Sequence, residues 1–227
     1  MNYACYPSFE HLLKEVYADV HKEWLTPQFK SEFEKSLRIV YSNAVFTRGK
    51  NFCPNPVDIL APYKIIKPKD VKVFVVGQDP YPKLKNAVGI AFHADGNWTV
   101  SLKAFRDSLE EFNHDSGDGY SLINWVRQGV LLSNITLTVQ EGKSDSHTTY
   151  WENVVKHLIR LIPKESVSVA FGKNAKVIEG IPSLRRVEYM HPAERSGKFA
   201  KTKDVFGEIN ECLESLKLEP IDWSMSR

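Results

Sequence analysis

The chain has 227 residues, of which 42% are hydrophobic and 26% are charged. This composition is typical of a soluble globular domain and excludes a disordered chain, a coiled coil and a membrane bundle. The 30 Lys and Arg residues and 28 Asp and Glu residues give a formal net charge of +2. That balance excludes a polycationic nucleic-acid-binding tail but allows a local basic surface.

Cysteine usage and the N-terminal sequence indicate an intracellular protein. The cysteines Cys5, Cys53 and Cys212 are far apart and form no CxxC pair, so we expect neither a disulfide framework nor a zinc site. No signal peptide or membrane-spanning segment is recognisable. We expect a cytoplasmic protein, or one in a nuclear or host-cell compartment containing DNA if its source is eukaryotic or viral.

Hydrophobic periodicity predicts alternating helices and strands in one domain spanning residues 1–227. Helices are predicted at residues 9–41 with a break at Pro27, 101–112 with Ser101 as N-cap, 150–161 and 206–216. Buried strands are predicted at residues 71–76, 130–133, 167–171 and 186–190. The proline-rich segment 51–68 is expected to be mostly loop. This order predicts a three-layer α/β/α fold around a mainly parallel four-stranded sheet.

Polar side chains follow the predicted strands at the points where they end. Asp79 and Tyr81 follow the first strand, Asn134 ends the second, and His191 follows the fourth. Ligands of parallel sheets bind beyond the carboxyl ends of the strands, so we expect these residues to converge. Taken singly, each has a structural interpretation as a turn, cap or core residue. Their joint order at strand ends favours a site.

The chemistry of this set indicates hydrolysis without a metal or a covalent intermediate. The Asn134 amide offers both a donor and an acceptor and could read the N3–H and O4 edge of uracil. Phe92 could stack on a flat ligand. No set of residues has metal-ligand spacing, and no Ser or Cys nucleophile stands beside a base.

Four motifs give the chain a specific resemblance. Gly-Gln-Asp-Pro-Tyr at 77–81, Gly-Ile-Ala-Phe at 89–92, Leu-Leu-Ser-Asn-Ile-Thr-Leu-Thr-Val at 131–139 and His-Pro at 191–192 follow one another along the chain. In this order and at these spacings, the chain resembles the family 1 uracil-DNA glycosylases over most of its length. Segments 53–56, 99–102 and 220–223 also resemble stretches of that family.

The resemblance implies excision of uracil from DNA, yielding free uracil and an abasic site, with no metal or organic cofactor. Asp79 would orient or activate the attacking water and stabilise positive charge on the sugar. His191 would hydrogen-bond uracil O2 as negative charge builds there. Asn134 would read the base, Phe92 would stack on it, and Tyr81 would exclude the methyl group of thymine. The main chain around Gln78 would also contact uracil.

The resemblance also implies contacts with the DNA backbone. The residues concerned are Pro54, Pro56, Ser101, Lys173, Arg195 and Ser196. Basic residues cluster near the last motif, which fits phosphate binding. The expected partners are uracil-containing DNA, single- or double-stranded, and a protein inhibitor that mimics DNA. We expect a monomer that does not bind membranes.

The sequence departs from the family pattern at three positions and leaves rival functions open. Pro82 stands where the family usually has histidine, Ala193 replaces a serine, and Arg195 replaces the leucine that wedges into the base stack. Pro82 and the Ala-x-Arg ending at 193–195 resemble poxvirus-type members. One alternative is a replication processivity subunit that keeps the fold with secondary or lost catalysis. Another is an enzyme of free nucleosides, which competition by undamaged DNA would distinguish.

Overall fold

The computed structural model describes residues 3–46, 51–172, 181 and 183–227. Its helices are α1 (Phe9–Tyr17), α2 (Pro27–Phe46), α3 (Ala61–Ile65), α4 (Val100–Glu111), α5 (Ile123–Arg127), α6 (Thr148–Ile159), α8 (Phe199–Thr202) and α9 (Val205–Ser215). Its strands are β1 (Phe52–Cys53), β2 (Val73–Gly77), β3 (Val130–Asn134), β4 (Val139–Gln140), β5 (Val167–Phe171) and β6 (Arg185–Tyr189).

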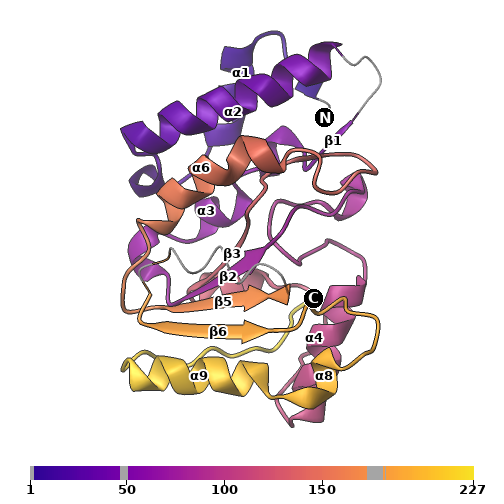
Figure 1. The fold of residues 1–227 in the computed structure, drawn as a ribbon, viewed down its shortest axis with the longest axis vertical. Helices are drawn as coiled ribbons and strands as arrows, with labels where there is room; N and C mark the ends of the chain where they lie inside the picture. The colour runs from indigo at the N-terminus through magenta and orange to yellow at the C-terminus, as the bar shows by residue number, and fades with distance from the viewer. Residues whose placement is uncertain (1–2, 47–50, 173–180, 182) are drawn as a thin grey trace.

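The main sheet has the strand order β3-β2-β5-β6, and all its neighbours are parallel. Helices lie on both sides of it: α1, α2 and α6 above, and α4, α8 and α9 below in the view of Figure 1. This arrangement confirms the predicted three-layer α/β/α fold. Strands β1 and β4 form a separate antiparallel pair.

The burial of the strands explains why their prediction was accurate. Every residue of the central strands β2 and β5 is buried, as expected for strands covered on both faces, and every residue of the edge strand β3 is buried as well. Strand β6 lies at the edge of the sheet and exposes Arg185, Arg186 and Glu188. Charged residues on an edge strand disfavour pairing with another chain.

Several predicted boundaries were wrong. The predicted break at Pro27 is confirmed, because α2 begins there, but residues 18–26 before it are not α-helical and α2 continues to Phe46. The proline-rich segment contains α3, because Pro62 occupies its first turn, where no donor is needed. Ser101 is not the N-cap of α4. The cap is Thr99, whose side chain accepts a hydrogen bond from the Leu102 N–H.

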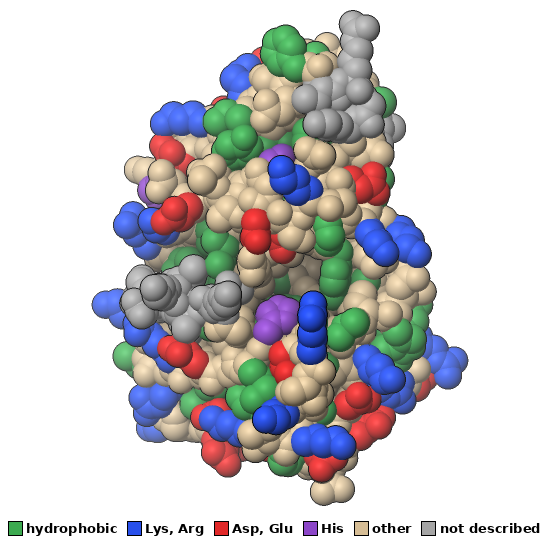
Figure 2. All heavy atoms as spheres, turned by 45° about the vertical axis from the view of Figure 1, so that its right-hand side comes forward, with side chains coloured by type: hydrophobic (Ala, Val, Ile, Leu, Met, Phe, Trp, Pro, Cys, Tyr) green, Lys and Arg blue, Asp and Glu red, His purple; other side chains and the backbone are tan. Residues whose placement is uncertain are grey.

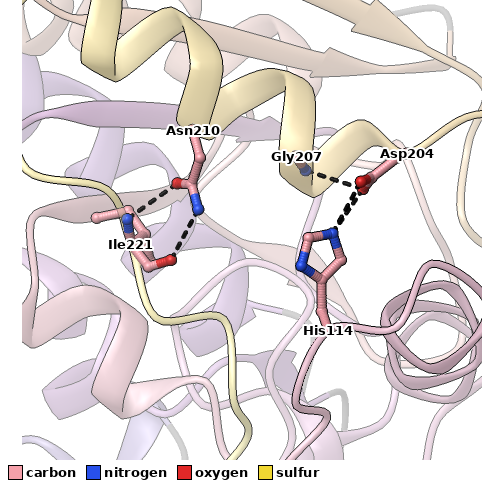
Figure 3. A network of polar contacts seen from close by, with 5 residues as sticks. All are labelled: His114, Asp204, Gly207, Asn210 and Ile221. Atoms are coloured by element: carbon pink, nitrogen blue, oxygen red, sulfur yellow. Dashed lines mark hydrogen bonds and ion pairs between the residues drawn. The ribbon is translucent and has the colours of Figure 1, made fainter.

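Polar contacts fix α9 and the C-terminal segment beneath the sheet (Figure 3). Asp204 is the N-cap of α9: its carboxylate accepts from the Gly207 N–H at 2.8 Å and lies 2.8 and 2.9 Å from His114 Nε2. The Asn210 amide bonds both the N–H and the carbonyl of Ile221, at 2.9 and 3.0 Å. The contact between His114 and Asp204 joins segments 90 residues apart in the sequence.

The structure offers no helix suited to crossing a bilayer within the residues it describes, since none is both long and apolar enough.

Candidate active site

A cavity of about 300 Å³ lies at the carboxyl end of the main sheet. Figure 2 shows a hollow on this face of the molecule, with Lys and Arg side chains distributed around it. The cavity is lined by seven of the predicted site residues: Gln78, Asp79, Tyr81, Phe92, Ser101, Asn134 and His191. The fold therefore brings together residues from separate parts of the chain, as the strand-end argument predicted.

The ends of β2 and β3 set the position of Asn134. Gly77 and Asn134 are partners in the parallel register, and a Cβ atom on Gly77 would overlap the Asn134 side-chain oxygen. Glycine is therefore required at position 77 for this amide to occupy its place. The Asn134 side chain is 5% exposed and makes no hydrogen bond within the described part of the chain. Its donor and acceptor are thus available to a ligand in the cavity.

Asp79 is held by the loop that follows β4. Its Oδ2 accepts a hydrogen bond from the Asp145 N–H at 2.8 Å, and the Asp145 carboxylate accepts one from the Gln78 amide. Burial raises the pKa of Asp79, and the Asp145 N–H bond acts in the opposite direction. The hydrogen bond to Asp145 N–H favours the ionised carboxylate and fixes its orientation.

Tyr81 and Phe92 form an aromatic wall that polar contacts keep in place. The Tyr81 hydroxyl donates to the Phe92 carbonyl at 3.0 Å and shares a hydrogen bond with the Thr99 hydroxyl at 2.8 Å. Phe92 adopts a φ of +65°, which is strained for a bulky side chain. Its ring lies edge-on to the rings of Phe105 and Phe171, at 5.5 and 5.7 Å. Packing therefore holds a strained residue at the cavity.

His191 is held in the neutral tautomer that carries its proton on Nε2. The Ala193 N–H donates to His191 Nδ1 at 3.0 Å, so Nδ1 must be unprotonated. Burial lowers the pKa of His191, which also favours the neutral ring. The backbone of Gly172, at φ +73°, passes close to the imidazole: a Cβ there would lie 3.1 Å from His191 Cβ. The Nε2–H is left as the donor for a ligand.

The residues predicted to contact DNA differ in their exposure to solvent. Pro54 and Pro56 are buried, Ser101 is buried at the cavity wall, and Arg195 is exposed. Ser196 is also exposed, but its N–H and hydroxyl both donate to the Glu194 carboxylate. Lys173 lies outside the described residues.

Glu194 organises the loop between β6 and α8. Besides Ser196, its carboxylate accepts from the N–H groups of Lys198 at 2.6 Å and Phe199 at 3.3 Å. These bonds close the loop around one side chain and leave Arg195 exposed.

Four residues that contribute to the site were missed by sequence analysis: Asn86, His93, Ser144 and Asp145. Asn86, His93 and Ser144 line the cavity. The Asn86 side-chain oxygen is buried without a partner, and His93 is 1% exposed with its Nε2 lying 3.1 Å from Asp95. No motif marked these positions. A search for polar residues between Tyr81 and Phe92 could have suggested Asn86.

The part of the chain that the structure describes contains no group of three His, Cys, Asp or Glu side chains able to hold a metal ion.

The fold and the site together define a class of protein. The model of the uracil DNA glycosylase superfamily matches residues 63–214, which is more than half of the chain. The chain therefore belongs to the uracil-DNA glycosylase superfamily.

The individual relatives come from bacteria and viruses. The chain is 32% identical over 225 residues to the uracil-DNA glycosylase of Clostridium perfringens strain 13, covering 92% of this chain and 98% of that protein. It is also 32% identical to the uracil-DNA glycosylase of psittacid herpesvirus 1, covering 96% of this chain and 63% of that protein.

Solved structures share the fold. The crystal structure of mimivirus uracil-DNA glycosylase superposes with a TM-score of 0.76 at 21% identity, covering 96% of this chain and 90% of that one. A second mimivirus structure, of a Y322L variant in complex with UGI, gives the same TM-score and covers 97% of this chain and 96% of that one.

Proposed function

We propose that this chain is a monofunctional uracil-DNA glycosylase of base excision repair, and that the cavity is its uracil pocket. The observation that carries the proposal is the convergence of Asp79, Asn134 and His191 on one cavity beyond the sheet. In this role the protein flips uracil out of DNA and hydrolyses its N-glycosidic bond. The products are free uracil and an abasic site.

His191 acts on the leaving base. Cleavage of the glycosidic bond leaves negative charge on uracil, and the Nε2–H of a neutral His191 donates to O2 as that charge develops. The bond from Ala193 N–H supports this role, because it fixes the tautomer before the substrate arrives. A donor positioned in advance contributes about 10²–10³-fold to turnover.

Asp79 acts on the sugar and the water. An ionised carboxylate stabilises the positive charge that develops on the sugar, and it orients the attacking water. The hydrogen bond from Asp145 N–H supports the ionised state against the effect of burial. Both effects require the carboxylate to be in place before the bond breaks.

Asn134, Phe92 and Tyr81 select the base. The unbonded Asn134 amide pairs with O4 and N3–H of uracil and leaves cytosine mismatched, because the donor and acceptor of cytosine are exchanged at that edge. Phe92 stacks on the flipped ring, and the main chain at Gln78 contacts it. Tyr81 occupies the space beside C5, so the methyl group of thymine is rejected.

DNA is bound around the mouth of the cavity, in single- or double-stranded form. The exposure of Arg195 supports a role as the residue that enters the vacated stack or grips phosphate. Ser101 acts from the cavity wall, Ser196 must release its bonds to Glu194 before it can donate to a phosphate, and Lys173 adds a positive charge. Because Pro54 and Pro56 are buried, they act by shaping the loop that holds Asn55 rather than by direct contact.

The wider setting follows from this activity. The protein works as one catalytic domain and as a monomer, in a compartment that holds DNA. The buried core that runs from Tyr3 to Met225 supports the single domain. The UGI complex of the mimivirus protein supports a protein inhibitor as a second partner, one that mimics DNA and covers the cavity.

The test is a strand-cleavage assay in EDTA on a labelled oligonucleotide with one uracil, followed by alkali. Matched oligonucleotides carry thymine or cytosine at the same position. Cleavage at uracil alone is the expected result. Absence of cleavage by a protein that still binds the oligonucleotide would refute the proposal and favour a non-catalytic replication subunit.

A further inference from the structure

Trp98 directly precedes Thr99, the N-cap of α4 that bonds Tyr81 of the cavity wall, and it is exposed to solvent. The chain has five tryptophans, and Trp24, Trp125, Trp151 and Trp223 are buried. Trp98 is 46% exposed, and Val100, two residues further on, is 67% exposed. Exposing a large aromatic ring forgoes the free energy that its burial would supply, so the position calls for an explanation.

Thr99, between these two side chains, contacts the cavity wall, and Ser101, directly after them, lines the cavity. Thr99 caps α4 and bonds the Tyr81 hydroxyl at 2.8 Å, and Ser101 lines the cavity itself. Adjacent Cα atoms lie about 3.8 Å apart. Trp98 is therefore directly connected to the wall beside Tyr81, within reach of a nucleotide next to the one whose base enters the cavity.

The Trp98 ring is held in place on the protein. The Tyr120 ring lies edge-on to it, with centroids 5.9 Å apart and planes at 74°. The Arg106 guanidinium lies 5.3 Å from the Trp98 centroid, and its Nε bonds the Glu110 carboxylate at 2.9 Å. An exposed ring that its neighbours orient loses little conformational freedom when a second flat group stacks on it.

Lys103 is the cation on α4 that can approach a phosphate of a nucleic-acid strand. It is exposed one turn beyond Val100. Arg106 on the same helix is paired with Glu110, and the exposed Asp107 lies one turn beyond Lys103. An aromatic ring beside cationic side chains is the arrangement by which proteins bind single strands, with bases stacked on the ring and phosphates near the cations.

We propose that Trp98 is a stacking platform for a base adjacent to the flipped uracil. The inference deepens the proposed function and rests on it, because it assigns the partner as the same DNA strand that enters the cavity. Stacking is tolerant of sequence, since every base has a flat face. The platform therefore strengthens binding of single-stranded uracil DNA irrespective of the neighbouring base.

Tryptophan fluorescence tests the contact directly. Acrylamide quenches exposed tryptophan, and Trp98 is the exposed one. The Asp79→Asn variant, which is expected to bind uracil DNA with little cleavage, supplies the complex. A saturating uracil oligonucleotide is expected to protect the quenchable fraction of this variant. Trp98→Phe in the same background is the control, and it should have little quenchable fluorescence with or without DNA. Unchanged quenching of the Asp79→Asn protein at saturating DNA would overturn the proposal.

Kinetics supply a second readout. Trp98→Ala is expected to raise KM for a single-stranded uracil oligonucleotide about tenfold. Trp98→Phe, which keeps a flat ring, should restore most of the affinity. Phe46→Ala is the matched control, because Phe46 is an exposed aromatic residue at the end of α2, far from α4 (Figure 1). A KM for Trp98→Ala equal to that of Phe46→Ala would overturn the proposal.

The two experiments separate this inference from the proposed function. Protection of Trp98 by DNA, when the wild-type protein never releases uracil, would overturn the glycosylase function and keep the platform. Release of uracil without protection of Trp98 would overturn the platform and keep the function.

Discussion

The cavity floor, formed by residues 77–81, Phe92, Asn134 and His191, and the β6 loop, formed by residues 192–198, are built in different ways. The floor is held by parallel strand register, a required glycine and an aromatic residue in a strained conformation. The β6 loop beyond His191 is mostly exposed and is held by the carboxylate of Glu194.

This difference explains two of the three departures from the family pattern, at Ala193 and Arg195, but not the one at Pro82, which lines the cavity. A substitution in the floor would disturb packed neighbours, so its residues match the family motifs. A substitution at an exposed loop tip disturbs little as long as the loop keeps its shape. Glu194 supplies that shape through hydrogen bonds, and the tip can then carry Arg195 in place of leucine. Substitutions in the floor should therefore change turnover and base selection. Substitutions in the β6 loop should change how the protein binds DNA.

The largest effect on turnover is expected from Asp79→Asn. The amide oxygen can still accept from Asp145 N–H, but the negative charge is lost. We expect turnover to fall by about 10²–10⁴-fold with DNA affinity nearly retained. Single-turnover kinetics and a binding titration measure the two quantities. Asp145→Asn, which keeps the N–H, is the matched control and should have a far smaller effect. Equal turnover of Asp79→Asn and wild type would remove Asp79 from catalysis.

His191→Ala should reduce turnover by about 10²–10³-fold, because the Nε2–H donor to the developing anion is lost. Steady-state kinetics should place the loss in kcat more than in KM. His191→Gln, which offers an amide donor, is expected to recover part of the rate. Wild-type turnover in His191→Ala would mean that another group stabilises the leaving uracil.

The pH dependence of kcat/KM should report both groups of the floor. Asp79 works ionised and burial raises its pKa above 3.8, so activity is lost as pH falls through that raised value. His191 works neutral and burial lowers its pKa below 6.5, so protonation of His191 reduces activity only below pH 6.5. Below the controlling pKa the rate should fall about tenfold per pH unit. Full activity persisting at pH 3.8 would contradict this assignment.

Tyr81→Ala should admit thymine by removing the ring beside C5. We expect measurable release of thymine from an oligonucleotide that the wild-type protein leaves intact, because one methyl group is worth about 10–200-fold in discrimination. Tyr81→Phe keeps the ring and loses only the bonds to Phe92 and Thr99, so it should still reject thymine. Continued rejection by Tyr81→Ala would show that another group sets the filter.

The smallest effect on activity is expected from a substitution in the β6 loop. Arg195→Ala should reduce activity on duplex DNA by about tenfold or less, and activity on single strands by less, because only a duplex leaves a gap in a base stack. Arg195→Leu, which has the side chain usual in the family, should restore the duplex activity. A larger loss on single strands would indicate that Arg195 grips phosphate instead.

The sheet and the helices that cover it could be predicted because their signals are local. The apolar run of β2 and the mostly apolar run of β5, interrupted by Ser168, identify buried strands, and helical spacing identified α6 and α9 to within two residues. Helices α5 and α8 have five and four residues, too short for periodicity to reveal. Helix α2 was predicted too short. It continues to Phe46, because nothing in the sequence stops it at residue 41.

The site could be predicted in part. Strand ends and motif order located Asp79, Asn134 and His191, because parallel strands deliver their carboxyl ends to one edge. The contact from Asp145 could not be found, since it is a main-chain N–H 66 residues away in an irregular loop. The positive φ of Phe92 and the commitment of Ser196 to Glu194 also depend on tertiary contacts.

The most direct test of the central claim is a crystal structure of the Asp79→Asn variant with a uracil-containing oligonucleotide. We expect uracil in the cavity, with O2 at His191 Nε2, O4 and N3–H at the Asn134 amide, and the ring against Phe92. Uracil that remains in the base stack, or that binds outside this cavity, would contradict it.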